Sequence, residues 1–358
     1  MRNPTLLVPP TVNARDTLSL TSHPSFVKSV IVEAVHEMSA IARSPQRWKA
    51  ILAFALVYVF WGSTYLGIRI GVEEIPPLLM AGTRFVIAGP LMMLFCAMQG
   101  RRVRVNWAQA LRLAGLGICM LSGANTILSW AEQWVPTGLA SLLVAVTPLW
   151  FLVLETWVFS GEHKVSPRAL GGLGIGIAGM FVLLWPQLRH TGGLGHKELL
   201  GSVGLIFGSL SWALGSVLSK RWKIQLDAFS AASWEMFFAG AFNVTLAFIL
   251  GEQHQAHWTP RGIGAIAYLI VFGSWVGFTA YVYLLNNVPT PKVATYAYVN
   301  PVVAVFLGWL VLHEQITPHI FAGTVIIVCA VALVTGAELK ARKPEEGLAL
   351  PAVESTGD

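Results

Sequence analysis

The sequence predicts an all-α membrane protein with ten transmembrane helices, arranged as two inverted five-helix repeats. Three observations predict this fold class. Of the 358 residues, 55% are hydrophobic and only 12% are charged, against roughly 25% charged in soluble proteins. The apolar residues fall into runs of about 20, which is the length that crosses a bilayer as a helix. These runs are continuous, whereas a transmembrane β-barrel requires alternating polarity.

Ten apolar runs are expected to span the membrane as helices, because lipid offers an exposed backbone no hydrogen-bond partner. Short connections separate them, and several carry turn or cap signals: EEIPP after the first run, EQWVPT before the fourth and NNVPTP before the ninth. The expected spans are residues 50–70, 77–98, 109–130, 137–158, 168–186, 200–219, 229–250, 262–284, 291–312 and 318–338.

The two ends of the chain differ from the spans. Residues 1–48 are polar at first, and amphipathic spacing of apolar residues begins at Phe26 and runs to Ile41. This extension is expected to be disordered or to form an interfacial helix, with Met38 as an alternative start of the chain. Residues 339–358 are expected to form a disordered cytoplasmic tail, because they are polar and lack a periodic apolar pattern.

The positive charges predict the orientation in the membrane. If the N-terminus is cytoplasmic, sixteen Lys and Arg residues lie on the cytoplasmic side, in 43–49, 101–112, 164–168, 220–223, 292 and 340–343. The opposite side holds four: Arg69, Arg189, Lys197 and Arg261. This positive-inside bias predicts a multi-pass protein of the cell inner (cytoplasmic) membrane with both termini cytoplasmic. The net charge of +6 does not indicate nucleic-acid binding, because the cations occupy loops between apolar runs.

An internal repeat is the most informative pattern. Trp61 and Arg69 match Trp212 and Lys220 at an offset of 151 (212 − 61). VPTGLASLLVAVTP from 135 matches VPTPKVATYAYVNP from 288, and GEHKVSPRALGG from 161 matches HEQITPHIFAGT from 313. The repeats are expected at 49–188 and 199–338. Since each holds five spans, an odd number, the copies enter the membrane in opposite directions, as in many secondary transporters.

These residues carry a family resemblance. FWGSTYLGIRIGVEEIPPLLMAGTRF, from Phe60, and TYAYVNPVVAVFLGWLVLHEQIT, from Thr295, resemble the drug/metabolite transporter superfamily. Within it they are similar to the EamA group and its YedA-type inner-membrane permeases, over about residues 50–338. The resemblance implies export of amino acids or related small metabolites and drugs. It also implies a central cavity lined by spans 1, 3, 4, 6, 8 and 9.

Polar and aromatic residues on these spans are the candidate substrate-cavity residues. Pro148 and Pro301 interrupt spans 4 and 9 at corresponding places, which in transporters points to the binding site, although simple packing kinks are an alternative. Each proline frees a carbonyl one turn back. The complete set is Trp61, Ser63, Thr64, Ser122, Asn125, Ser129, Thr147, Pro148, Trp212, Tyr281, Tyr296, Asn300 and Pro301.

Three ionisable residues lie within spans: Arg84, Glu155 and Glu235. Such groups need a partner, water or neutralisation. Arg84 matches Glu235 at the offset of 151 and is therefore expected near the opposite membrane face, without a direct salt bridge. Either glutamate is a candidate carrier of a coupling proton, and structural pairing is the alternative. Glu162 and Glu314 hold matched loop positions and are expected at helix starts beside spans 5 and 10.

The sequence indicates no enzyme, metal or cofactor. GIGIAG at 174–179 lies inside an apolar helix without a preceding strand, so it is not a dinucleotide-binding loop. His254 and His257 have no third metal ligand near them in sequence. The predicted function is a secondary transporter that works by alternating access, with a small-molecule substrate and the lipid bilayer as its partners. A ten-span sensor or scaffold and a passive channel are the alternatives.

Overall fold

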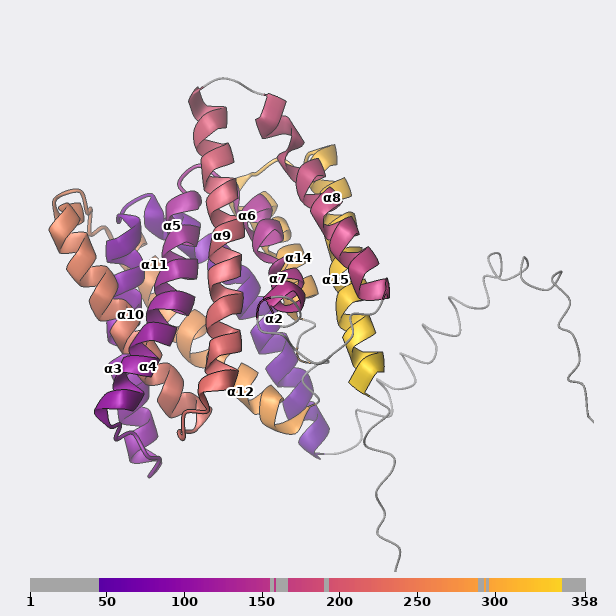
Figure 1. Cartoon of the computed structure of the whole chain (residues 1–358). Helices are drawn as coiled ribbons and strands as arrows, with labels where there is room; N and C mark the ends of the chain where they lie inside the picture. The colour runs from indigo at the N-terminus through magenta and orange to yellow at the C-terminus, as the bar shows by residue number, and fades with distance from the viewer. Residues whose placement is uncertain are drawn as a thin grey trace, which may run out of the picture. The chain divides into compact units, whose positions relative to one another are not determined.

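The computed structural model in Figure 1 describes residues 45–154, 158, 167–189, 193–288, 293 and 296–342. The chain divides into two units, Met1–Ile51 and Leu52–Asp358, and the architecture below is that of the second unit. The predicted amphipathic segment 26–41 and most of the predicted tail lie outside the described residues.

Helices form the whole of the regular structure among the described residues. The first repeat contains α2 (Pro45–Val72), α3 (Pro77–Met98), α4 (Trp107–Gly117), η1 (Ile118–Thr126), α5 (Ile127–Ala131), α6 (Thr137–Val144), α7 (Thr147–Val153) and α8 (Pro167–Arg189). The second contains α9 (Gly193–Trp222), α10 (Ala228–Leu250), η3 (Glu252–His254), α11 (Pro260–Tyr268), η4 (Leu269–Val276), α12 (Gly277–Asn287), α14 (Tyr296–Leu312) and α15 (Pro318–Arg342).

The helices of the described part reproduce the ten predicted spans. Six are long and apolar enough to cross a membrane, and they correspond to predicted spans 1, 2, 3, 6, 7 and 8. Four shorter apolar helices, Thr137–Val153, Leu170–Pro186, Val299–Leu312 and Pro318–Leu333, correspond to spans 4, 5, 9 and 10. Large apolar side chains such as Phe181, Phe207 and Phe321 are exposed on their outer faces, as lipid contact favours.

Local capping explains where several helices begin and end. Proline at N1 starts α3 and α11, where its missing amide costs nothing. Asn106 and Gln109 form a capping box at the start of α4, and Asp227 accepts from two amides at the start of α10. The α10 helix ends at Gly251, whose φ of +77° a residue with a side chain rarely adopts.

Spans 3 and 8 contain a feature that the sequence pattern did not indicate. In each, an α-helix passes through a π-helical segment before it resumes, at η1 in span 3 and η4 in span 8. The two segments begin 151 residues apart (269 − 118), which is the repeat offset. Segments of π-helix are rare and are often found at functional sites, so their presence in both copies marks these two spans.

Helices of opposite repeats pack against one another. The η1 segment packs on α9 and α10, whereas η4 packs on α3, so each π-helical segment lies against early spans of the other repeat. The corresponding spans α3 and α10 also pack together, as do α8 and α15. In Figure 1 the α3–α10 pair lies at the left of the bundle and the α8–α15 pair at the right.

The ends of α3 and α10 are joined across the repeats by two polar contacts. At one end, Glu252 Oε2 accepts a 2.8 Å hydrogen bond from the amide of Leu79 in the first turn of α3. At the other end, Arg101 Nη1 lies 3.1 Å from Oδ1 of Asp227, the N-cap of α10. The antiparallel crossing brings the end of each helix to the start of the other, which makes both contacts possible.

Candidate functional site

Three predicted cavity residues form an aromatic triad where the two repeats meet. Trp61 comes from α2 of the first repeat, and Tyr281 and Tyr296 come from α12 and α14 of the second. The ring centroid of Trp61 lies 4.9 Å from that of Tyr281 and 5.2 Å from that of Tyr296. The two tyrosine rings are 5.8 Å apart and edge-on. These distances are typical of favourable aromatic pairs, so the triad is a packed cluster of three rings.

The π-helical segment of span 8 holds the tryptophan of the triad. Trp61 Nε1 donates a 3.2 Å hydrogen bond to the carbonyl oxygen of Gly273 in η4. The indole also lies against Gly277, where an added β-carbon would fall 2.5 Å from Nε1. Any larger residue at 277 would displace the ring. The glycine is therefore required here by the close approach of the indole to the backbone.

The polar residues that follow Trp61 in α2 are satisfied by nearby groups. Ser63 Oγ and Tyr268 Oη share a 2.5 Å hydrogen bond that joins α2 to α11. Thr64 Oγ1 donates to the carbonyl of Trp61 at 2.6 Å, while its methyl group faces Gly273. The polar end of the first span thus packs onto span 8 instead of facing lipid.

Arg84 of α3 is a buried charge beside the triad. Its residue is only 7% exposed, and Nε donates a 3.1 Å hydrogen bond to Ser274 Oγ in η4. A β-carbon at Gly273 would lie 2.9 Å from Arg84 Nη2, so the guanidinium borders the residue that binds Trp61. Within the described part of the chain no carboxylate lies within ion-pair distance of it. An arginine at mid-membrane costs about 2.5–3.5 kcal/mol on insertion scales.

Asn300 places a buried polar group on the same helix as Tyr296. It is four residues further along α14 and 8% exposed, and its Oδ1 has no hydrogen-bond partner among the described residues. Its backbone carbonyl approaches Gly62, the neighbour of Trp61, where a β-carbon would lie 3.2 Å from that oxygen. Pro301 follows inside α14. Asn300 Oδ1 is therefore a buried acceptor without a hydrogen-bond donor in the described residues, close to the contact between α2 and α14.

In span 4 the proline interrupts the helix between α6 and α7. Pro148 occupies the first turn of α7. Thr147 Oγ1 donates a 2.7 Å hydrogen bond to the carbonyl of Val144, one turn before the proline. A carbonyl that the proline deprives of its amide partner is thereby satisfied within the same span.

The other cavity candidates are not brought into the triad. In span 3, Ser122 Oγ donates to the carbonyl of Ala239 in α10 at 3.4 Å, and Ser129 Oγ donates to that of Asn125 at 2.8 Å. Ser122, Asn125 and Ser129 are spaced for one face of an α-helix, but the π-helical turn at 118–126 changes the residue spacing per turn, so they do not keep one face. Trp212, the counterpart of Trp61, is half-buried in α9, and no ring contact involves it among the described residues.

Of the two glutamates proposed as proton carriers, the structure describes Glu235 but not Glu155. Glu235 lies in α10, where its backbone packs against Gly117 of span 3; a β-carbon at Gly117 would fall 2.9 Å from the carbonyl carbon of Glu235. Arg84 contacts η4, so the described contacts show no Arg84–Glu235 ion pair. Glu155 lies outside the described residues.

A buried carboxylate at the end of span 3 is not among the candidate residues chosen from the sequence. Glu132 is fully buried, and neither carboxylate oxygen has a hydrogen-bond partner in the described residues. Arg69 donates to its backbone carbonyl. Burial raises the pKa of Glu132 well above its usual range, the Glu314 carboxylate adds to the increase, and Arg69 opposes it.

The sequence position of Glu314 predicted a role at the start of span 10. In the structure its carboxylate instead binds the start of α6 in span 4. Its two carboxylate oxygens accept hydrogen bonds from the amides of Thr137, at 2.8 Å, and Gly138, at 3.2 Å, at the start of α6. The α14 helix packs on α6, so the turn after α14 reaches the first repeat before α15 begins. Glu162, its sequence counterpart, lies outside the described residues.

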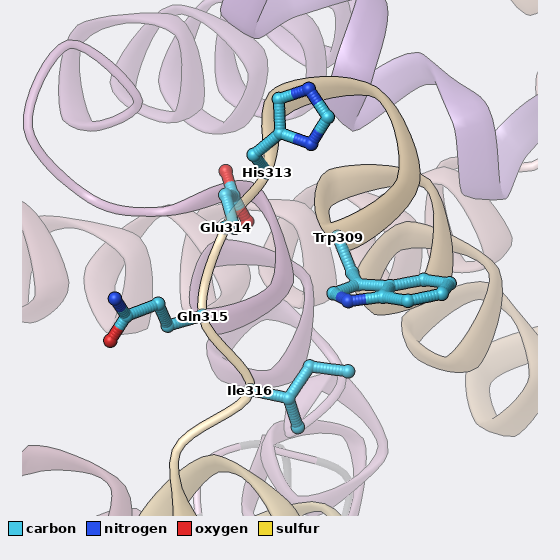
Figure 2. A pocket seen from close by; sticks show the side chains of 5 residues that line it. All are labelled: Trp309, His313, Glu314, Gln315 and Ile316. Atoms are coloured by element: carbon cyan, nitrogen blue, oxygen red, sulfur yellow. The ribbon is translucent and has the colours of Figure 1, made fainter.

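Two surface hollows of the described part lie away from the triad. One of about 380 Å³ lies between Trp309 and the turn from His313 to Ile316, and Figure 2 shows Gln315 pointing away from Trp309 there. Another, of about 400 Å³, lies between the end of α2 and the connection from α10 to α11. Neither is lined by a triad residue.

Comparison with known proteins decides the family. The EamA-like transporter family matches the chain twice, over residues 48–185 and 199–336. The chain belongs to the EamA-like transporter family. The two matches correspond to the predicted spans 1–5 and 6–10. The family assignment and the ten-span plan expected from the sequence are thereby confirmed.

Several relatives are named as transporters. "Uncharacterized inner membrane transporter YedA" of Escherichia coli K12 is 38% identical over 285 residues, which cover 79% of this chain and 89% of that protein. "Uncharacterized transporter YoaV" of Bacillus subtilis 168 is 25% identical over 80% of this chain and 97% of its own length. A Salmonella typhimurium LT2 protein named "Probable amino-acid metabolite efflux pump" is 27% identical over 76% and 90%.

A solved crystal structure shares the fold. It covers 82% of this chain and 98% of its own, with a TM-score of 0.57 and 18% sequence identity. Together with the family match and the apolar helices, this defines a multi-pass EamA membrane protein. The family and its named members place the chain among transporters rather than enzymes.

Proposed function

We propose that this protein is a secondary transporter that exports amino acids or related small metabolites and drugs across the cytoplasmic membrane by alternating access. The aromatic triad is the observation that carries the proposal. It joins span 1 of one repeat to spans 8 and 9 of the other, at the place where inverted-repeat transporters hold their substrates. The named amino-acid efflux relative supports the substrate class, and the inner-membrane relative supports the location.

Substrate would enter when the repeats move apart. Rocking of one repeat against the other separates Trp61 from the two tyrosine rings and opens a space lined by all three. The two π-helical segments support such a movement, because each lies at a contact between the repeats and departs from regular helical hydrogen bonding. The excess of Lys and Arg in alternate connections supports cytoplasmic termini.

Transport by purified protein in liposomes tests the proposal. The twenty amino acids and a set of small drugs are offered with and without a pH gradient, which also tests for a coupling proton. Trp61→Ala is expected to lower transport roughly two- to tenfold. This range corresponds to the free energy of about 0.5–1.5 kcal/mol that an aromatic pair contributes. Trp309→Ala is the matched control, because Trp309 is 49% exposed on the same bundle and lies outside the triad.

Size-exclusion profiles of the two variants show whether both insert and fold. Equal transport by Trp61→Ala and the wild-type protein would refute the role of the triad. A wild-type protein that moves no compound of either set would refute the transport function itself.

A further inference from the structure

We propose that Arg84 binds the carboxylate of the transported molecule, so that the substrates are carboxylate-bearing amino acids rather than amines or cationic drugs. The inference rests on the proposed function and narrows its substrate class. It starts from a charge that the described structure leaves without a counter-charge, inside a membrane span and beside the aromatic triad.

Among the described residues, most of the hydrogen-bond donors of Arg84 have no acceptor. The side chain donates from Nε to Ser274 Oγ, and because Ser274 is only 1% exposed, this bond is shielded from solvent. The plane also lies 4.8 Å from the ring centroid of Phe85. Arginine presents donors in a rigid fork whose geometry matches a carboxylate with two parallel hydrogen bonds. A single bond at Nε leaves the two terminal nitrogens to make such a pair.

The position of the guanidinium links it to the triad. Gly273 borders both groups: its carbonyl accepts from Trp61 Nε1, and a β-carbon added to it would lie 2.9 Å from Arg84 Nη2. Gly273 has no side chain to separate the two groups, so the indole and the guanidinium border one backbone position. A molecule seated against the triad rings would therefore meet the terminal nitrogens of Arg84 at one end.

A second buried polar group without a hydrogen-bond partner in the described residues suits the ammonium group of an amino acid. Asn300 Oδ1 is a buried acceptor without a partner in the described residues, one turn from Tyr296 of the triad. An acceptor of this kind binds an ammonium group, whereas Arg84 binds a carboxylate. The aromatic rings of the triad suit the apolar part. A buried cation and a buried acceptor thus match the two charged groups of a free amino acid.

Selective transport of acids over their amides tests the proposal. The full-length protein in liposomes is offered each of the twenty amino acids beside its amide and its decarboxylated amine, together with the same drugs as above. The wild-type protein is expected to move at least one amino acid and to prefer it about ten- to a hundredfold over both analogues, as for the loss of one charged hydrogen-bonded pair.

Variants assign this preference to Arg84. Arg84→Gln is expected to lower transport of the acid and to leave that of the amide unchanged, which removes the preference. Arg84→Lys keeps the charge but not the fork, and it is expected to retain the preference at a weaker level. Arg101→Gln is the control, because Arg101 is a partly exposed arginine paired with Asp227 at the end of α3.

The outcomes separate this inference from the proposed function. Equal transport of acid and amide by the wild-type protein overturns the inference while the transporter stands, as does movement of drugs or amines without any acid. An unchanged preference in Arg84→Gln also overturns it. If Arg84→Gln does not fold, Arg84→Lys replaces it in the test. An acid-to-amide transport ratio in Arg84→Lys equal to that of the wild-type protein then overturns the inference, and a lower ratio supports it. Transport of nothing at all refutes the proposed function and the inference together.

Discussion

Replacement of Gly89 by alanine should destabilise the protein through the crossing of α3 and α10. A β-carbon at Gly89 would lie 2.6 Å from the amide nitrogen of Phe237 and 2.8 Å from the carbonyl oxygen of Ser233. Both atoms belong to the backbone of α10, so no side chain can rotate away. Gly240 of α10, which is 151 residues later, meets the backbone of Val86 in the same way. The two glycines are repeat counterparts and occupy one crossing.

The expected loss of stability follows from how far the backbones of α3 and α10 must move apart to admit the β-carbon. Ordinary contact begins at 3.4 Å, so the backbones must separate by 0.8 Å (3.4 − 2.6) at this point. Overpacking of this kind costs about 1–3 kcal/mol, whereas alanine gains about 0.8–1.0 kcal/mol over glycine in helix propensity. At Gly174 of α8 an added β-carbon meets nothing within 4 Å. Gly174→Ala therefore keeps the gain alone, and the two variants should differ by about 1–3 kcal/mol.

Thermal unfolding in detergent measures the difference. The fraction of each purified variant that remains monodisperse after heating is determined by size-exclusion chromatography. We expect Gly89→Ala to lose stability relative to Gly174→Ala, and Gly89→Ala with Gly240→Ala to lose less than the sum of the two singles, because the first change already separates the helices. If Gly89→Ala is as stable as Gly174→Ala, the helices are not as close as described and the reasoning fails.

Two further predictions concern carboxylates near the ends of the spans. Glu314→Ala should cost about 0.5–2 kcal/mol through loss of its two amide contacts at the start of α6; Gln315→Ala, in the same turn, should cost little, and equal losses would contradict the capping role. Because burial raises the pKa of Glu132, the folded state holds that proton to higher pH than the unfolded chain does. Stability should therefore be highest below the usual glutamate range and fall as the pH rises toward the raised pKa. Glu132→Gln should remove this decline, as measured by thermal unfolding at a series of pH values, and an unchanged slope would argue against a buried, protonated Glu132.

Much of the fold could be predicted because membranes impose simple rules on sequence. The length and continuity of the apolar runs indicated ten spans, since every spanning backbone must satisfy its own hydrogen bonds. The match of Trp61 and Arg69 with Trp212 and Lys220 gave the repeat offset, and five spans per copy required inversion. The turn signal EQWVPT was placed directly before span 4, and α6 begins there at Thr137.

The candidate site was harder to predict. Trp61, Tyr281 and Tyr296 were proposed from three separate spans, yet nothing in their spacing shows that the rings touch. The span 3 candidates Ser122, Asn125 and Ser129 are spaced for one face of an α-helix, and the π-helical turn at 118–126 changes that spacing. Trp212 matches Trp61 in sequence but lacks the ring contacts.

The sequence by itself determined the membrane environment, the number of spans and the inverted repeat, because each depends on composition, on run length or on offsets along the chain. The tertiary structure alone decided which residues meet. It placed Arg84 beside Trp61 at Gly273 and directed Glu314 to the start of α6 in the other repeat. Such contacts depend on how helices of opposite copies cross, and a crossing is set by close approach at small residues far apart in the chain, such as Gly89 and Gly240.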